Sequence, residues 1–271
     1  MGKKFTRWEI LKRLRKTIAD NKPIIAAGCS AGIIAKSAEM GGADLIMVYS
    51  TGLSRLKGLP TTLIDNSNEV TLNMLPEIRK VVKDTPIIAG IEASSTSGDQ
   101  DPSELINQFI DAGFSGIINF PTIGLIRDKQ WRKKKGFQKE IEMIQRACDR
   151  KVFSMAYVFW PMDARSMAFA GVDCLVPHVG GTAGGTVGYD ALTHREAAER
   201  IQKMIGSAKK VNPKIFCLGH GGPFATPDDT IYLYQHTDAA GFVGASSIER
   251  IPVEKAVKLT VLEFKNIPVK K

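Results

Sequence analysis

Short apolar runs alternate with longer helical patterns along the whole chain. Eight of these runs are rich in β-branched residues and are expected to be strands: Pro23–Ala27, Asp44–Tyr49, Pro86–Ile91, Gly116–Phe120, Val152–Phe159, Cys174–His178, Ile215–Leu218 and Gly241–Gly244. Most are continuously apolar rather than alternating, which is typical of parallel strands that are buried on both faces. They begin on average about 31 residues apart, which is the length of one strand–helix unit.

Helical patterns fill the intervals between these runs. They cover Ala31–Gly41, Asn68–Val82, Asp101–Ala112, Gln138–Arg150, Met162–Ala170, Leu192–Val211 and Pro227–Ala239, and Val253–Phe264 follows the last run. The order of elements predicts an α/β protein, a (β/α)8 TIM barrel, with residues 1–271 in a single domain. Residues 1–22 would form an extra N-terminal helix that covers the bottom of the barrel, and residues 23–271 the barrel itself.

Length and composition fit this interpretation. The chain has 271 residues, 44% hydrophobic and 24% charged, and (β/α)8 barrels need roughly 250 residues. Apolar runs fall short of the ~20 residues that cross a bilayer, so we expect no membrane partner. The N-terminal stretch is charged and amphipathic rather than an apolar signal core. Four cysteines, widely spaced and without a CxxC pair, predict a reducing, cytoplasmic location.

The formal charge of +9 raises the question of nucleic-acid binding. Residues 1–22 hold eight Lys/Arg against two acids, and Arg127–Lys135 holds six against one. Neither run carries an RNA-binding signature or interleaved aromatic residues, so we expect solvated surfaces and no specific nucleic-acid partner. Steering of an anionic substrate by the second run is the alternative.

Two junctions near the C-terminus are rich in Gly and Ser: Leu218–Pro223 and Gly241–Arg250. In a (β/α)8 barrel such junctions lie at the carboxyl ends of strands, where backbone N–H groups and helix N-termini bind anions. The residues expected to bind a small anionic metabolite at this rim are Ser30, Arg55, Asn119, Thr182, Gly222, Gly244, Ser246, Ser247, Glu249 and Arg250. Arg55 would act as a bidentate clamp, whereas Glu249 and Arg250 could instead form structural salt bridges.

Three further residues are candidates for catalysis. Glu92 ends an apolar strand, where a carboxylate is costly unless it meets solvent, a cation or a metal, so it is a candidate general base or metal ligand. His178 and His220 follow two strands on the same rim and could transfer protons, bind a substrate oxygen or hold a metal; the alternative is a packed core histidine. Gly28–Gly32 matches G-x-S-x-G, but it follows the first strand, so Ser30 is not expected to be a nucleophile.

Several segments together resemble a known family: Ala35–Ile46, Gly113–Leu125, His178–Gly188, His220–Pro223 and Gly241–Glu254. The chain resembles the phosphoenolpyruvate hydrolase-like TIM-barrel proteins, also described as TIM-barrel signal-transduction proteins, which are similar to the phosphoenolpyruvate mutase and isocitrate lyase group. The resemblance implies a hydrolase or lyase acting on a phosphoenolpyruvate- or pyruvyl-like acid. It also implies Mg²⁺ as the candidate cofactor, no organic cofactor, and a homo-oligomer.

The loop near Arg127 and a shortened segment around Gly58–Asp65 depart from the family pattern, and so do two further loops, Tyr49–Arg55 and Glu92–Pro102. Both follow strands on the side of the barrel expected to carry out the chemistry. The alternative function is therefore a non-catalytic barrel that senses a ligand or binds another protein.

Overall fold

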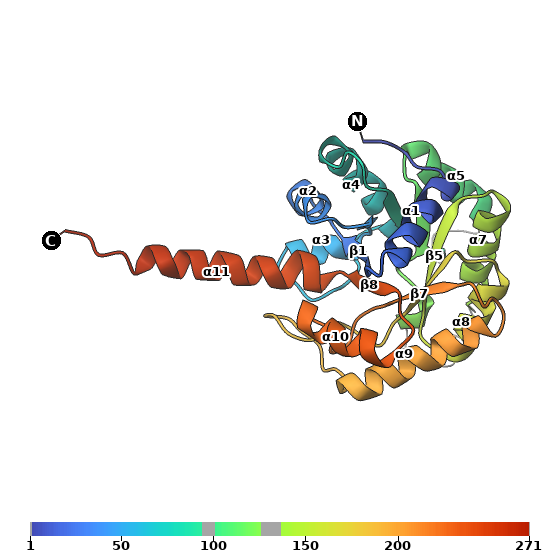
Figure 1. Cartoon of the computed structure of the whole chain (residues 1–271). Helices are drawn as coiled ribbons and strands as arrows, with labels where there is room; N and C mark the ends of the chain where they lie inside the picture. The colour runs from blue at the N-terminus through green and yellow to red at the C-terminus, as the bar shows by residue number, and fades with distance from the viewer. Residues whose placement is uncertain (1, 94–100, 126–136, 271) are drawn as a thin grey trace.

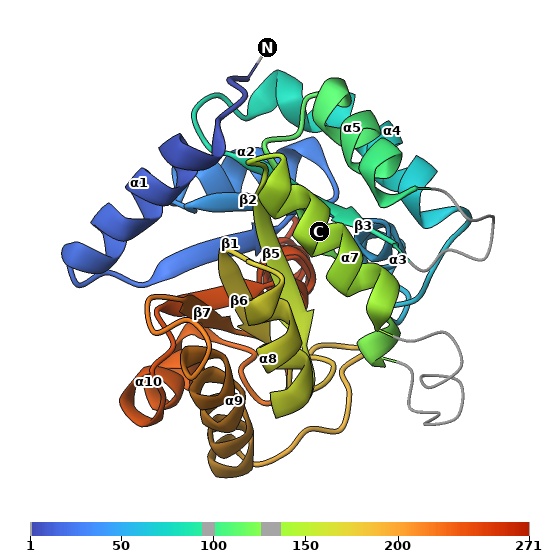
Figure 2. The same ribbon diagram turned by 90° about the vertical axis from the view of Figure 1, so that its right-hand side faces the viewer.

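The structure, a computed structural model, describes residues 2–93, 101–125 and 137–270. Eight parallel strands form a closed barrel in chain order, and the first pairs with the last (Figure 1, Figure 2). The strands are β1 (Ile24–Gly28), β2 (Leu45–Val48), β3 (Ile87–Ile91), β4 (Gly116–Asn119), β5 (Phe153–Val158), β6 (Cys174–Pro177), β7 (Phe216–Gly219) and β8 (Gly241–Gly244). The predicted (β/α)8 barrel is confirmed, and each strand end lies within one residue of its predicted position.

Helices surround the barrel in the described part of the chain (Figure 2). They are α1 (Arg7–Ala19), α2 (Gly32–Met40), α3 (Thr51–Leu56), α4 (Ser67–Val81), α5 (Pro102–Ala112), α7 (Gln138–Asp149), α8 (Pro161–Phe169), α9 (His194–Lys209), α10 (Pro227–His236) and α11 (Ile251–Lys265). Two short turns complete them, the 3₁₀ turn η1 (Ile123–Leu125) and the π turn η2 (Ser246–Arg250). The sequence did not predict α3 or η2, because each is too short for helical periodicity to show.

Alternate strand residues face the barrel interior and the surrounding helices. Met47 and Ile88 lie in the cluster that fills the barrel, whereas their neighbours Ile46 and Ala89 pack under α4 and α5. Both faces of each strand are therefore apolar, which explains why the strand runs lack a polar alternation.

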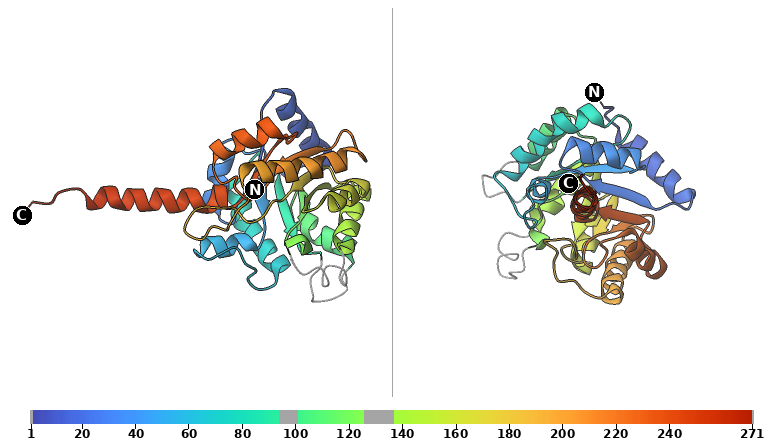
Figure 3. Two further views of the ribbon diagram at one scale, coloured as in Figure 1. Left: turned by 90° about the horizontal axis from the view of Figure 1, so that it is seen from below. Right: turned by 90° about the vertical axis from the view of Figure 1, so that its left-hand side faces the viewer.

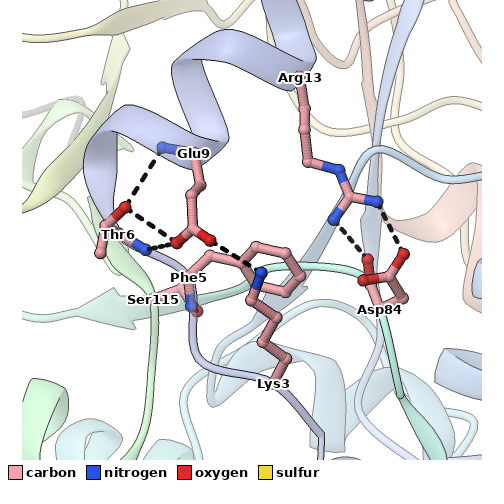
Figure 4. A network of polar contacts seen from close by, with 7 residues as sticks. All are labelled: Lys3, Phe5, Thr6, Glu9, Arg13, Asp84 and Ser115. Carbon is pink, nitrogen blue, oxygen red and sulfur yellow. Dashed lines mark hydrogen bonds and ion pairs between the residues drawn. The ribbon is translucent and has the colours of Figure 1, made fainter.

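Helix α1 closes the bottom of the barrel, as expected. Its Ile10 and Leu14 join the interior cluster, and Arg7 bonds the carboxylate of Asp173 with Nε at 3.0 and 2.9 Å and Nη2 at 2.8 Å. Arg13 donates to the backbone oxygen and the carboxylate of Asp84, which precedes β3 (Figure 4). Thr6 begins the helix with a capping box to Glu9. Residues that precede strands thus hold the lower rim, opposite the rim where a site is expected.

Helix α11 projects away from the barrel (Figure 1, Figure 3). Its base is fixed by Arg250, which donates to Glu254 at 3.0 Å and to the backbone oxygen of Gly184 at 3.1 Å. Beyond this base its apolar side chains are exposed: Val253, Val257, Leu259, Val261, Leu262 and Phe264. None of the described helices is long and apolar enough to cross a membrane.

Candidate functional site at the carboxyl ends of the strands

The barrel mouth, which we define as the rim at the carboxyl ends of the strands, is tightly packed where β1, β2 and β8 end. A Cβ on Gly52 of α3 would lie 1.4 Å from Ser30 Oγ and 3.2 Å from Glu249 Oε1. A Cβ on Gly28 would lie 2.9 Å from the Tyr49 hydroxyl. The glycines are therefore needed for α3 and η2 to reach the ends of the strands, and they bring Ser30 and Glu249 together.

Arg55 and Glu249 form an ion pair inside this packing. Arg55 Nε lies 2.6 Å and Nη2 2.5 Å from Glu249 Oε1, with side-chain exposures of 2% and 0%. Burial is the largest single effect and lowers the pKa of Arg55, but the charge and hydrogen bond of Glu249 together with the two tyrosines raise the pKa overall. The guanidinium also lies over the Tyr49 ring, 5.4 Å from its centroid. Arg55 is thus held by a carboxylate of the chain itself.

Some buried polar atoms near this pair have no hydrogen-bond partner among the described residues. They include Ser50 Oγ at the end of β2, Ser247 Oγ in η2, and Glu249 Oε2. Buried polar groups are normally satisfied by protein, water or ligand. These atoms therefore mark this side of the mouth as polar and incompletely satisfied.

Aromatic rings line the middle of the mouth. The rings of Tyr49 and Phe120 lie 4.7 Å apart, and those of Phe120 and Tyr157 lie 5.2 Å apart. The side chains of Tyr49 and Tyr157 also interact with each other. Burial raises the pKa of Tyr49 to about 12 and that of Tyr157 well above its usual range, so both hydroxyls stay protonated at neutral pH.

His178 and His220 lie beside Tyr157, and their ring centroids are 4.6 Å apart. A β-bridge between the two residues continues the pairing of β6 with β7 beyond the strands. Burial, and then His220, lowers the pKa of His178 well below its usual range. Burial lowers the pKa of His220 to about 4, although its hydrogen bond with Val243 opposes the shift. Both histidines are therefore neutral at physiological pH.

A network around Glu140 positions Asn119. Glu140 on α7 is fully buried and accepts hydrogen bonds from Asn119 Nδ2, from Thr122 Oγ1 at 2.8 Å and from the backbone nitrogen of Ile123 at 2.7 Å. Asn119 in turn accepts from the Tyr157 nitrogen at 2.7 Å and donates to the Tyr157 oxygen at 3.2 Å. Asn119 therefore joins β4 to β5 on the outer face of the barrel, the face that α7 covers.

Sequence reasoning missed Glu140, although the sequence carries a signal for it. Glu140 shares the inward face of α7 with Met143, Ile144 and Ala147, at helical spacing. A carboxylate in the apolar stripe of an amphipathic helix is costly unless it is bonded, which indicates a buried polar network.

The remaining candidates lie around the same rim. Glu92 is half-buried, and its backbone exchanges hydrogen bonds with the Asn68 side chain at 2.9 and 3.2 Å. Thr182 is buried, and Gly222 donates to the oxygen of Gly180 at 3.0 Å. The basic run 127–135 lies outside the described residues.

The expected anion residues of the last junction divide into two groups. Gly244 ends β8, and a Cβ there would lie 2.5 Å from Ile248 and 3.0 Å from Ser247 Oγ. The turn that contains Ser246 and Ser247 therefore packs tightly against the end of β8. The Arg250 side chain instead donates hydrogen bonds to Glu254 and to the backbone oxygen of Gly184 at the base of α11. Glu249 and Arg250 therefore both form structural salt bridges, which was the alternative that the sequence left open.

The phosphoenolpyruvate hydrolase-like family matches residues 9–267 of the chain. The chain belongs to this family. Two tomato (Solanum lycopersicum) proteins, ToMV susceptible protein tm-1(GCR26) and ToMV resistance protein Tm-1(GCR237), are each 36% identical to it over 269 residues. These matches cover 95% of this chain and 35% of the tomato proteins, so this member of the family spans about a third of their length.

A solved structure with the same fold is a phosphonopyruvate hydrolase in complex with oxalate and Mg²⁺. It aligns with a TM-score of 0.62 and 18% identity, covering 96% of this chain and 87% of the other. At this identity the likeness establishes the fold of the phosphoenolpyruvate hydrolase-like chain.

Mg²⁺ prefers oxygen ligands, keeps several waters, and is bound through one or two carboxylates together with substrate oxygens. The described residues contain no group of three or more His, Cys, Asp or Glu side chains that could hold a metal ion. The Glu92 carboxylate has no ion pair or hydrogen bond among those residues. Glu92, directly after β3, is thus a single carboxylate, which is the smallest protein contribution with which such a hydrated ion is bound.

Proposed function

We propose that the chain is an enzyme of the hydrolase or lyase type that acts on a small carboxylated or phosphorylated metabolite at the barrel mouth. The observation that carries this proposal is the position of His178 and His220, two neutral histidines with ring centroids 4.6 Å apart at the ends of β6 and β7. A neutral imidazole beside an anion site can donate a hydrogen bond to a substrate oxygen through its N–H, or take up a proton at its unprotonated nitrogen.

In this proposal the turn after β8 holds the anionic end of the substrate. Gly244, Ser246 and Ser247 supply backbone and hydroxyl donors, and the unpartnered Ser247 Oγ supports a polar group there. Thr182 and Gly222 would line the neighbouring edge. Arg55 would position this turn through Glu249, because Glu249 already occupies its Nε and offsets its charge.

Glu92 would be the carboxylate that holds Mg²⁺ or takes a proton. A bound Mg²⁺ would supply positive charge to substrate oxygens. The two tyrosines would orient the substrate from the middle of the mouth, in a site from which the aromatic rings exclude water, while Asn119 would hold β4 and β5 in place behind them.

The test compares Glu92→Gln with the wild type against pyruvate, oxalate, phosphoenolpyruvate and phosphonopyruvate, with and without MgCl₂. Thermal shift measures binding, and NMR of the mixture measures consumption. We expect the Gln variant to bind a ligand and to lose turnover, whereas Glu104→Gln on the exposed face of α5 should behave as the wild type. Unchanged turnover in Glu92→Gln would remove Glu92 from the reaction.

A ligand that stabilises the protein and is never consumed would favour the second candidate, a ligand-sensing barrel. The ion pair supports this alternative, because Arg55 is already bonded to Glu249 and is less available to a substrate. The chain spans about a third of the length of the tomato relatives, which also fits a binding unit within longer proteins.

We also propose that the chain forms a homo-oligomer through α11. Exposed apolar side chains on a helix that projects from its own barrel are costly in water unless another surface covers them. A second copy presents exposed apolar residues of its own, such as Ile33 and Met40 on α2. Light scattering should give a dimer or larger assembly for the wild type and for Lys258→Glu, and a monomer for Val257→Glu/Val261→Glu. An unchanged mass in that double variant would contradict this proposal.

The cytoplasmic location stays a prediction from the sequence. The four cysteines are free thiols in the structure, which supports a reducing compartment.

A further inference from the structure

The backbone fixes the tautomers of the two mouth histidines. The Nδ1 atom of His178 lies 3.0 Å from the backbone nitrogen of Gly180, which can only donate, so this Nδ1 carries the lone pair. The Nδ1 atom of His220 lies 2.7 Å from the backbone oxygen of Val243, which can only accept, so this Nδ1 carries the proton. In the neutral rings, His178 therefore has its proton on Nε2 and His220 has a lone pair there.

Both Nε2 atoms remain for a ligand. Neither Nε2 atom has a hydrogen-bond partner among the described residues. Neither is fully buried, unlike Ser247 Oγ and the other unpartnered polar atoms of the described residues. The rings are 5% and 7% exposed, so they are reached through a small opening. The site thus presents one donor, on His178, and one acceptor, on His220, from rings whose centroids lie 4.6 Å apart.

A hydroxyl is the ligand group that satisfies both atoms at once. It accepts the hydrogen bond from His178 and donates its own proton to His220. A carbonyl oxygen or a carboxylate can accept from His178, but its lone pairs would face the lone pair of His220. A site with a fixed acceptor therefore rejects an analogue that has no proton to donate, because a polar group is then left unpaired.

The place of His220 indicates what lies next to this hydroxyl. Val243, its backbone partner, immediately precedes Gly244, where the turn with Ser246 and Ser247 begins. A ligand that reaches both that turn and the histidines carries an anionic group and a hydroxyl, and the smallest acid with both is a 2-hydroxy acid.

We propose that His178 and His220 form a donor–acceptor clamp that selects a 2-hydroxy acid over the matching 2-oxo acid. This inference rests on the proposed function, because it assumes that a small acid binds at the mouth. It adds the chemical class of that acid and assigns a separate role to each histidine.

The surroundings of the pair keep the clamp in this state. Phe159 stacks on His178 with a centroid distance of 4.6 Å, and the Tyr157 ring contacts both imidazoles at 5.4 and 5.1 Å. Burial lowers the pKa of both histidines, so both stay neutral. In a cation both ring nitrogens would carry a proton, and His220 Nε2 could no longer accept a hydrogen bond. The rings are fixed in orientation and stay neutral.

The test is a matched series of three-carbon acids: lactate, pyruvate and propionate, which carry a 2-hydroxyl, a 2-oxo group and neither. We expect lactate to bind at least about tenfold more tightly than the other two by ligand-observed NMR titration, a difference of about 1.4 kcal/mol. Equal affinities, or tighter binding of pyruvate, overturn the clamp and leave the proposed function standing. If none of the three binds, the hydroxy-acid assignment fails, and the separate titration with oxalate, phosphoenolpyruvate and phosphonopyruvate decides whether the proposed function stands.

Variants and spectra separate the clamp from a structural role. His220→Phe and His178→Phe should each bring lactate to the affinity of propionate, and His236→Phe on the surface of α10 should keep the preference. Because a buried variant can fail to fold, ¹⁵N NMR of the histidines in the wild type provides a second measurement. It should find the proton on Nε2 of one mouth histidine and on Nδ1 of the other, and the same tautomer or a cation at both would overturn the clamp.

Discussion

Arg55 Nε lies 2.6 Å from Glu249 Oε1, although the two residues are 194 positions apart in the chain. The bond connects α3, after the second strand, to η2, after the eighth, and so it crosses the end of β1 where the barrel closes. Both side chains are buried, so neither charge is satisfied by bulk water. The pair therefore holds α3 and η2 together on the side of the mouth where the loop Tyr49–Arg55 departs from the family pattern.

Removing one partner of this pair should cost more stability than replacing both. Arg55→Met leaves the Glu249 carboxylate buried without its cation, which costs about 3–5 kcal/mol of unfolding free energy. Arg55→Met/Glu249→Leu removes both charges and should be more stable than the sum of the two single changes indicates. Urea denaturation of the four proteins completes the cycle. Additive losses would mean that the two charges do not stabilise each other.

Glu140 should make stability fall as the pH rises. Its pKa is raised to about 7 in the folded protein, mainly by burial, against a usual value of 4.5, so the folded state binds more protons between these values. The free energy of unfolding therefore decreases with pH between about 4.5 and about 7, by at most about 1.4 kcal/mol per pH unit from this group. Denaturation of Glu140→Gln across this range should lack that component.

The matched control for Glu140 is Glu142→Gln, because Glu142 lies on the same helix with its side chain 41% exposed. It should keep the pH slope of the wild type. A Glu140→Gln variant with an unchanged slope would show that Glu140 is ionised throughout the range.

Gly52 should not tolerate a methyl group. Gly52→Ala would place Cβ 1.4 Å from Ser30 Oγ and 2.6 Å from Ser30 Cβ, so α3 has to move at a cost of about 1–3 kcal/mol. Ser30→Gly removes both atoms, and thermal melts should show partial recovery in the double variant. Gly206→Ala in α9 meets open space and should be neutral or stabilising by up to about 1 kcal/mol. A failure of Ser30→Gly to help would place the clash elsewhere.

The first residues of the chain stabilise the helix that closes the barrel bottom. Thr6→Ala removes the capping box with Glu9 and should cost about 1 kcal/mol, whereas Thr6→Ser retains the hydroxyl and should behave as the wild type (Figure 4). Chemical denaturation measures both. Equal losses for Ala and Ser would show that the Thr methyl group, rather than the cap, matters at this position.

The barrel could be predicted from the sequence because its strands are apolar on both faces. Runs such as Ile87–Ile91 carry that pattern without any tertiary information. The relation between His178 and His220 was only partly predictable. Their common rim follows from strand order, but their tautomers depend on Gly180 and Val243, and Val243 lies 23 residues beyond His220. Contacts between distant segments, such as Arg55 with Glu249, leave no local pattern in the sequence.

The β-bridge between His178 and His220 extends the sheet past the ends of β6 and β7. Val179 donates to the oxygen of His220 at 3.1 Å, and Ala183 donates to the oxygen of Gly222 at 2.9 Å, so two successive loops are joined by backbone hydrogen bonds. The backbone of this part of the rim is therefore held in place by these hydrogen bonds. Adjustment to ligands of different length must come from the opposite arc of the rim, so substrate range can be altered there without disturbing the histidines.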